Sequence, residues 1–449
     1  MLKATYKWLA CILLMSCTSV SNNNNSDQET MSNKEWIRTT NIYEVNLRQY
    51  TKEGTINAFA AELPRLKEMG VETLWFMPIT PIAEKNKKGS LGSYYAAADY
   101  TSVSSEFGTI EDFKNFVKQA HDLGFKVIID WVANHTGWDH VWTKSHPDYY
   151  LKDSATGDFQ IASGMDDIIE LDFANPELRK AMIDAMKFWV TETGIDGFRC
   201  DLAFWVELDF WVEAKAELDK VKQLLWLAES DPLEKPEYMQ VFDIAYTWTW
   251  MHKSKDFYQQ GYAIDSLDAV LKKYSNAPGM KAWFTTNHDE NSWNGTEYEK
   301  YGDMAKALAV YSCTWPGVPL IYSGQELPNK KRLEFFEKDP IAWTGTYELH
   351  DFYKTLLELR TKNPSLNALE TETHRISTTD HKNIFAYLRK KGEKEVLVLL
   401  NLSKNASRFD INDPQLTGKF RNIFSAADND FTSEKSFEMQ AWEYLVYEK

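Results

Sequence analysis

The chain has 449 residues, of which 43% are hydrophobic, 14% aromatic and 26% charged. This composition is too apolar for a disordered chain, so we expect a folded protein of two or three domains, or one large barrel with additions. Its formal net charge of -16 argues against a nucleic-acid partner, because binding to a phosphate backbone depends on a basic face.

The first 16 residues have the features of a secretory signal. Lys3 and Lys7 precede an apolar run, and no second long apolar run follows in the chain. The run ends in the sequence LMSC at residues 14–17, which resembles the lipobox where a bacterial peptidase cuts before a cysteine that carries lipid. The resemblance implies that Cys17 is lipidated and that the protein lies in the bacterial cell envelope, on the outer membrane, facing the periplasm or the cell surface. An ordinary secretory signal with a chance cysteine is the alternative.

Residues 17–33 are expected to form a flexible tether, since residues 18–26 are mainly Ser and Asn. Contact with a membrane is therefore expected only through the lipid anchor. Beyond the two N-terminal cysteines the chain has only Cys200 and Cys313, so no disulfide framework is expected to hold the fold together.

From residue 41 onward, short apolar runs alternate with segments of helical periodicity. This order is typical of parallel strands joined by right-handed helical crossovers. The runs that we interpret as strands are 41–46, 71–78, 126–130, 197–201, 225–229, 241–246, 282–287 and 318–322. Eight such strands predict an α/β fold, a (β/α)8 TIM barrel whose catalytic residues lie at the carboxyl ends of the strands.

Two segments depart from this rhythm. Residues 136–172 interrupt it after the third strand and predict a small inserted domain. Residues 367–449 contain short alternating segments that predict a C-terminal antiparallel β-sandwich domain. The catalytic barrel is therefore expected to comprise residues 34–135 and 173–366.

Four of the predicted strands end in charged or polar residues. A single acid after a strand is more commonly a helix N-cap than a catalyst, but four matched strand ends are harder to explain in that way. They bring several carboxylates together with an arginine and two histidines at the expected barrel mouth. These residues are Asp130, Asn134 and His135 on the first of these ends, Arg199 and Asp201 on the second, Glu229 on the third, and His288 and Asp289 on the fourth.

The same segments resemble the alpha-amylase family, glycoside hydrolase family 13. The matching segments are 130–135 (DWVANH), 197–201 (GFRCD), 228–230 (AES) and 286–289 (TNHD). Further agreement comes from 93–100 (SYYAAADY), 106–109 (EFGT) and 317–326 (GVPLIYSGQE). The resemblance covers roughly residues 42–326, and the β-rich tail agrees with it only in position and character.

The resemblance implies a retaining glycoside hydrolase that cleaves α-glucosidic bonds in starch-derived α-glucans or maltooligosaccharides. Such an enzyme needs a carboxylate nucleophile and a protonated carboxyl about 5 to 5.5 Å away. The resemblance implies that Asp201 is the nucleophile, that Glu229 is the general acid/base, and that Asp289 grips sugar hydroxyls and helps to distort the ring. It also implies that the same sugar is bound or supported by Tyr95, Asp130, His135, Arg199 and His288.

Other residues near these segments are candidates for sugar contact or for packing. Five tryptophans on segments that follow catalytic strands could stack on glucose rings, although aromatic side chains are usually part of the core. They are Trp138, Trp142, Trp205, Trp211 and Trp293. Cys200 is expected to point to the opposite side of its strand from Arg199 and Asp201 and to serve only packing.

No cofactor is expected to be required. Asn134 and Glu170 match positions that hold structural calcium in many family members, and oxygen ligands suit that ion. However, Trp205 stands where typical alpha-amylases carry a histidine, and residues 46–51 lack the acidic calcium loop of some oligoglucosidases. The resemblance therefore leaves structural calcium open without implying it.

Two other functions remain as alternatives. A glucan transferase or isomerase of the trehalose-forming type would use the same covalent intermediate and pass the sugar to a hydroxyl group instead of water. A non-catalytic, lipid-anchored starch-binding protein is disfavoured, because the chain keeps all three acids that degenerate members usually lose in part. The choice between α-1,4 and α-1,6 bonds, between endo and exo action, and the oligomeric state stay open at this point.

Overall fold

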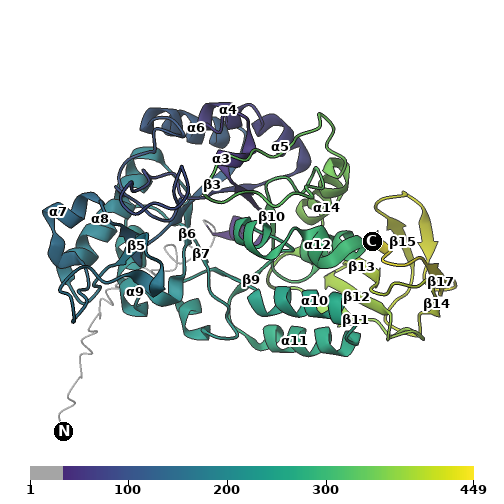
Figure 1. Ribbon diagram of the computed structural model, residues 1–449. Helices are drawn as coiled ribbons and strands as arrows, with labels where there is room; N and C mark the ends of the chain where they lie inside the picture. The colour runs from purple at the N-terminus through teal and green to yellow at the C-terminus, as the bar shows by residue number, and fades with distance from the viewer. Residues whose placement is uncertain (1–33) are drawn as a thin grey trace, which may run out of the picture.

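The computed structural model describes residues 34–449 (Figure 1). The predicted signal segment, Cys17 and the predicted tether lie outside the described residues. Within the described part of the chain, no helix has both the length and the apolar character needed to cross a membrane.

Eight parallel strands close into a barrel, which confirms the predicted fold class. Around the barrel they follow the order β1-β10-β9-β8-β7-β6-β3-β2. Their bounds are β1 Ile42–Val45, β2 Thr73–Phe76, β3 Lys126–Trp131, β6 Gly197–Cys200, β7 Leu225–Ala228, β8 Ile244–Tyr246, β9 Met280–Trp283 and β10 Val318–Tyr322.

Four strands begin at other residues than the sequence predicted. β1 starts at Ile42 instead of residue 41, and β2 starts at Thr73 instead of residue 71. β8 starts at Ile244 instead of residue 241, because Val241 still caps the short 3-10 helix Pro236–Gln240. β9 starts at Met280, where its backbone N–H donates to the carbonyl of Asp243, and it ends at Trp283. Residues 284–289 therefore leave the barrel wall and form part of the mouth.

Side chains alternate between the barrel interior and the surrounding helices, as the period of a strand requires. Ile42, Trp75 and Ile128 belong to one buried cluster with other inward residues of the strands. Phe198 and Cys200 belong to the larger cluster that the helices share. Arg199 lies between these two in sequence and so faces inward, and Cys200 packs outward as predicted.

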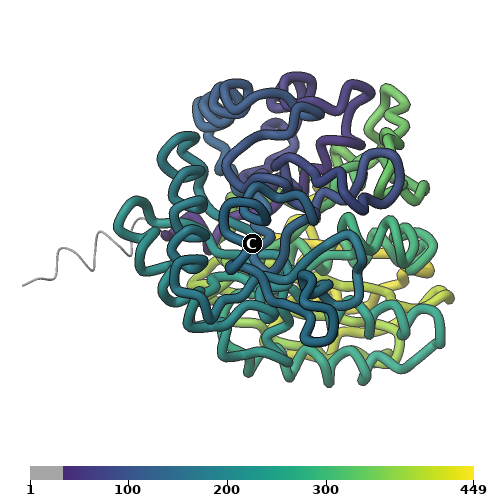
Figure 2. Tube along the Cα trace, turned by 60° about the vertical axis from the view of Figure 1, so that its left-hand side comes forward, coloured from purple at the N-terminus to yellow at the C-terminus, as the bar shows by residue number. Residues whose placement is uncertain are grey.

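The helices surround the barrel (Figures 1 and 2). The longer ones are α5 Leu63–Met69, α6 Ile110–Asp122, α8 Pro176–Thr193, α9 Leu208–Leu218, α10 Trp248–Gln260, α11 Ile264–Asn276, α13 Ala305–Thr314 and α14 His350–Lys362. The shorter ones are α2 Glu35–Thr39, α3 Leu47–Tyr50, α4 Ile56–Ala60, α7 Val141–Ser145 and α12 Glu297–Tyr301. Gly70 ends α5 in a left-handed conformation with φ of 93°, which glycine adopts without steric cost.

Smaller sheets extend the barrel at two places. Between β3 and α8, β4 His135–Gly137 pairs antiparallel with β5 Ile168–Glu170, so that His135 lies opposite Glu170. After α14 the chain forms a six-stranded antiparallel sheet and a two-stranded one around a common core. In Figure 1 the region of β5 and the yellow C-terminal sheets lie on opposite sides of the barrel.

The strands of the C-terminal sheets are between three and eight residues long. The six-stranded sheet has the order β11 Glu372–Arg375, β12 Ile384–Lys391, β13 Lys394–Asn401, β18 Tyr444–Glu448, β15 Lys419–Asn422 and β16 Asp428–Asp430. The second sheet pairs β14 Ser407–Asp410 with β17 Ser436–Met439.

Candidate active site

Arg199 lies at the centre of a buried charge network at the barrel mouth. Its side chain has no exposed surface. One terminal nitrogen, Nη1, lies 2.8 Å from Asp130 Oδ1 and 2.9 Å from Asp201 Oδ1. The other, Nη2, lies 2.8 Å from Glu229 Oε2. One guanidinium therefore holds acids from the ends of β3, β6 and β7 together.

The pKa values of the two acids on either side of this guanidinium differ. Burial raises the pKa of Glu229 to about 7; Arg199 opposes this rise, and the negative charges of Asp201 and Asp289 add to it. Burial also raises the pKa of Asp201, but only to about 6. Asp201 therefore loses its proton first, and between these values Glu229 keeps its proton while Asp201 is ionised.

The turn after Asp201 connects the two acids. Leu202 adopts a left-handed conformation with φ of 39°, which is uncommon for a residue with a branched side chain and costs about 1 to 3 kcal/mol. In this conformation its backbone N–H donates to Glu229 Oε2 over 2.9 Å. The strained turn thus fixes the Glu229 carboxyl relative to Asp201.

A second group of contacts surrounds His288. Its Nε2 lies 2.7 Å from the hydroxyl of Tyr95 and 3.3 Å from Asp289 Oδ2. The Tyr95 ring stacks on the imidazole with 5.4 Å between centroids, and its hydroxyl lies 3.2 Å from Asp130 Oδ2. The structure thereby joins Tyr95, His288 and Asp289 to the network around Arg199.

Glu44 is a member of the site that the sequence analysis missed. It lies on β1, it is fully buried, and its Oε1 contacts Nδ1 of His288. Burial lowers the pKa of His288, but the carboxylates of Asp289 and Glu44 outweigh this effect and raise that pKa well above its usual range. The signal in the sequence was a charged residue inside an otherwise buried strand. Glu44 keeps the imidazole charged and holds its ring in place.

A cavity of about 410 Å³ opens above these groups. Five of the predicted site residues line it: Tyr95, His135, Asp201, Glu229 and Asp289. Asp130, Arg199 and His288 lie buried next to those residues. The sequence analysis did not assign the wall residues Lys88, Phe335 and Phe336, which come from two different loops. Asp167, another wall residue, was a candidate only for completing a calcium site.

The tryptophans that were candidates for stacking on sugar rings differ in whether they line the cavity. Trp293 lines the cavity with about half of its surface exposed, and its ring centroid lies 5.3 Å from that of Phe335. Trp211 is fully buried in the core, so its assignment as a sugar platform was wrong. Among the described residues, the lining of this cavity does not include Trp138, Trp142 or Trp205.

The calcium candidates offer few free oxygen ligands. The Glu170 carboxylate accepts a hydrogen bond of 2.7 Å from the side chain of Gln160, and the Asn134 amide nitrogen lies 3.4 Å from His135 Nδ1. Within residues 34–449, no group of three or more His, Cys, Asp or Glu side chains is arranged to hold a metal ion. Asn134 and Glu170 therefore do not belong to a group of that kind.

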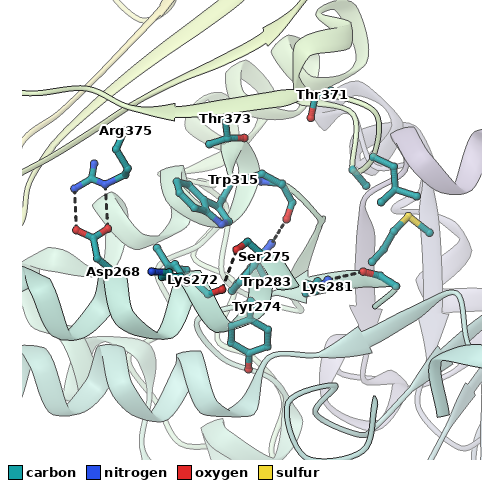
Figure 3. Close-up of a pocket in the computed structure, with 16 residues that line it drawn as sticks. Asp268, Lys272, Tyr274, Ser275, Lys281, Trp283, Trp315, Thr371, Thr373 and Arg375 are labelled. Atoms are coloured by element: carbon teal, nitrogen blue, oxygen red, sulfur yellow. Dashed lines mark hydrogen bonds and ion pairs between the residues drawn. The ribbon is translucent and has the colours of Figure 1, made fainter. Parts of the chain in front are cut away.

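A second cavity of about 590 Å³ lies elsewhere, between α11, the N-terminal ends of β9 and β10, and β11 (Figure 3). Arg375 spans it to contact Asp268 at 3.0 Å. Trp315 and Lys281 also line it. This cavity contains no pair of buried acids, and it lies at the end of the barrel away from the carboxyl ends of the strands, so it is not the catalytic site.

Comparison with known proteins agrees with this geometry. The sequence matches the family described as "Alpha amylase, catalytic domain" over residues 20–165 and 150–339. A noncanonic maltogenic alpha-amylase from Thermotoga neapolitana has a similar structure, with a TM-score of 0.83 and 30% identity, covering 92% of this chain and 99% of that one.

Two further relatives agree. An alpha-amylase from Lactobacillus plantarum has a TM-score of 0.82 and 27% identity over 92% of this chain and all of its own. The sequence of alpha-amylase 3 from Dictyoglomus thermophilum is 25% identical over 85% of this chain and 88% of its own length. The chain therefore belongs to the alpha-amylase family of glycoside hydrolases.

Proposed function

We propose that the protein hydrolyses α-glucosidic bonds in starch-derived glucans or maltooligosaccharides with retention of configuration. The observation that carries this proposal is the pair of acids on one guanidinium, Asp201 and Glu229, with pKa values in the order that the chemistry requires. Retaining hydrolysis needs one carboxyl ionised and the other protonated at the same pH.

In the first step the Asp201 carboxylate attacks the anomeric carbon and forms a glycosyl ester. Glu229 gives its proton to the leaving glycosidic oxygen, so the bond breaks without an unprotonated alkoxide as product. In the second step the Glu229 carboxylate takes a proton from water, which attacks the same carbon and releases Asp201. Glu229 then carries a proton again, and the cycle can repeat.

The neighbouring residues would hold the sugar. Burial lowers the pKa of His135 to about 4, so the ring is neutral, and its Nε2 has no hydrogen-bond partner among the described residues. His135 is part of the cavity wall, and this nitrogen would form a hydrogen bond with a sugar hydroxyl. Asp289, with 36% of its side chain exposed, would accept hydrogen bonds from other hydroxyls, and Tyr95 would support the ring face.

Product analysis tests this function. The purified protein is incubated with starch, pullulan, maltotriose and isomaltose, and the products are separated by chromatography. We expect shorter glucans whose new reducing ends are first released as α-anomers. Products longer than maltotriose in the incubation with maltotriose would instead identify the transferase alternative, and no product from any substrate would contradict an α-glucan hydrolase.

The pH profile should be bell-shaped. We expect kcat/KM for maltoheptaose to rise through about pH 6 as Asp201 ionises and to fall above about pH 7 as Glu229 loses its proton. Both limbs describe the coupled pair, because each carboxylate changes the charge that the other experiences. An activity that stays constant well above pH 7 would contradict the role of Glu229 as the proton donor.

The enzyme should tolerate removal of calcium. An ion that binds only the folded state stabilises it by mass action, so its loss would lower the melting temperature. We expect the melting temperature and the rate of maltoheptaose hydrolysis to stay the same in excess EDTA. A drop of many degrees that calcium alone restores would contradict this prediction and show that the folded protein binds calcium.

The N-terminus should carry lipid. We expect mass spectrometry of the mature N-terminal peptide, from protein made in a bacterium with lipoprotein processing, to show a diacylglyceryl group on Cys17. The support is the LMSC sequence at residues 14–17 and the Ser- and Asn-rich stretch after it. A mature terminus at another residue, without lipid, would refute the anchor and the proposed place at the outer membrane.

A further inference from the structure

The loops that follow β3, β2, β10 and β9 are joined to one another around the barrel mouth. Loop 84–92, which follows β2, reaches the inserted segment 136–172 through Lys88. The Lys88 ammonium lies 2.7 Å from Asp167 Oδ1 and 3.2 Å from Asp166 Oδ1. The backbone N–H groups of residues 84 and 85 also donate to Asp139 Oδ2, each over 3.2 Å.

The same loop is attached to the loop after β10 on its other side. The N–H of Ser90 donates to Glu337 Oε1 over 2.7 Å, and the Ser90 hydroxyl bonds to the other oxygen of that carboxylate. The N–H of Leu91 donates to the carbonyl of Phe336 over 3.2 Å. Loop 84–92 therefore spans from the inserted segment to the wall formed by Phe335 and Phe336.

The loop after β10 is in turn attached to the loop after β9. The N–H of Leu333 donates to Asn291 Oδ1 over 2.9 Å, and the Ser292 hydroxyl donates to the carbonyl of Leu333 over 2.8 Å. Trp293 packs against Phe335 in the cavity wall. These contacts extend the series of linked loops as far as the loop after β9.

In the order of the barrel these linked loops form one continuous arc. They follow β3, β2, β10 and β9, with β1 between β2 and β10. In the part of the chain that the structure describes, no hydrogen bond or ion pair connects residues 285–296 or 136–172 with residues 201–207 or 229–240. The loops after β6, β7 and β8 are bonded to one another, as Tyr238 donates to the carbonyl of Val206 and the N–H of Thr249 donates to Asp231. They contribute only Asp201, Leu202 and Glu229 to the cavity wall, whereas the arc supplies the rest, so this side of the mouth is the more open one.

The chemistry gives this asymmetry a direction. Glu229 follows β7 on the open side, and a general acid must lie beside the leaving oxygen. The leaving part of the substrate then extends over β6 to β8, while the non-reducing end of the donor points toward the linked arc. The whole catalytic cavity is only about 410 Å³, and Lys88 lies in the part of its wall that the arc forms.

We propose that loop 84–92, joined through Lys88 to Asp167, closes the non-reducing-end side of the site, so that the enzyme removes short units from chain ends. This inference rests on the proposed α-glucan hydrolysis. It identifies Lys88 as a residue that determines specificity, because its side chain bridges the loop to Asp167, which has only 6% of its side chain exposed. Oligosaccharides with a free non-reducing end are then the preferred substrates.

Two forms of one substrate test the inference. We compare 4-nitrophenyl α-maltoheptaoside having a free non-reducing end with the same compound blocked by a 4,6-O-ethylidene group, and follow both by chromatography. We expect the free form to lose short units from that end and the blocked form to react at least about a hundredfold more slowly, as a poorly fitting end group prevents productive binding. Equal rates, or long internal fragments as first products, would overturn closure of the site while leaving hydrolysis established. If neither form were cleaved, the proposed function would be wrong, and the inference with it.

A pair of lysine variants tests the bridge itself. We expect Lys88→Ala to raise the ratio of the rate on the blocked substrate to the rate on the free substrate at least about fivefold. The variant loses the ion pair that links loop 84–92 to Asp167, and the loss of a partly exposed ion pair corresponds to a fold-change of that size. Lys87→Ala is the matched control, since its ammonium pairs with Glu84 inside the same loop and reaches neither neighbouring loop. The same ratio in both variants would overturn the role of Lys88.

Discussion

Asp201→Asn and Glu229→Gln should each lose at least about a thousandfold in kcat on maltoheptaose, because each removes one half of the two-step reaction. Asp201→Asn has no carboxylate to attack the anomeric carbon. Glu229→Gln has no proton for the leaving oxygen and no base for the water. The kinetics are measured under saturating substrate for both variants and the wild type.

The same variants should keep their thermal stability. Folding raises the pKa of both acids, to about 6 and about 7, which means that their ionised forms are disfavoured in the folded state. Above these pKa values the wild type must keep two ionised carboxylates buried, which lowers its free energy of unfolding. A neutral amide at either position removes this destabilisation. We therefore expect the melting temperature at pH 8 to be equal to or higher than that of the wild type, measured by differential scanning calorimetry.

Suitable controls lie on the next helix. Asp209 and Glu213 are exposed acids on α9 that both pair with Arg179, and Asp209→Asn and Glu213→Gln should keep full activity. Azide, a small anionic nucleophile, should partly restore turnover of a substrate with a good leaving group. If Asp201→Asn or Glu229→Gln kept more than a few per cent of wild-type turnover, the assignment of that carboxylate would be wrong.

Arg199→Leu should be strongly destabilising. The substitution leaves Asp130, Asp201 and Glu229 buried without the positive charge that all three contact. Breaking a buried ion pair by removing one partner costs about 3 to 5 kcal/mol of unfolding free energy. We expect a loss of that size at pH 8 in urea denaturation, together with loss of hydrolysis.

This loss should shrink as the pH falls. Arg199 lowers the pKa of each of the three acids, so their pKa values rise further when it is absent. An acid with a raised folded-state pKa binds more protons folded than unfolded, and stability then increases toward lower pH. Arg408→Leu is the matched control, because Arg408 is 82% exposed and pairs with Glu438 at the surface, where such pairs contribute little. Equal stability of the two variants at pH 8 would contradict a structural role for the buried guanidinium.

The sequence predicted the parts of this site that depend on strand ends. Asp201, Glu229 and Asp289 each follow an apolar run, and parallel strands in a barrel bring their carboxyl ends to one mouth. Alternation along β6 also predicted that Arg199 and Cys200 face opposite sides. Local pattern was enough for these residues because their positions follow from the fold class alone.

Other parts could not be predicted because they depend on contacts between distant segments. Glu44 reaches His288 across 244 positions of the chain, and only the closed barrel shows that its carboxylate faces the imidazole. The link from Lys88 to Asp167 depends on where two irregular loops meet. β8 starts later than predicted because the residues just before it belong to a 3-10 helix and its cap, and such a short helix has no periodicity that the sequence reveals.

Trapping the covalent intermediate tests the central claim most directly. Glu229→Gln is incubated with α-glucosyl fluoride, whose leaving group needs no proton, so the first step can proceed while the second is slowed. Digestion and mass spectrometry should then show one glucosyl unit on the peptide that contains Asp201, attached to that carboxylate. A glucosyl group on another residue, or turnover that releases the β-anomer without any labelled peptide, would contradict a retaining mechanism with Asp201 as the nucleophile.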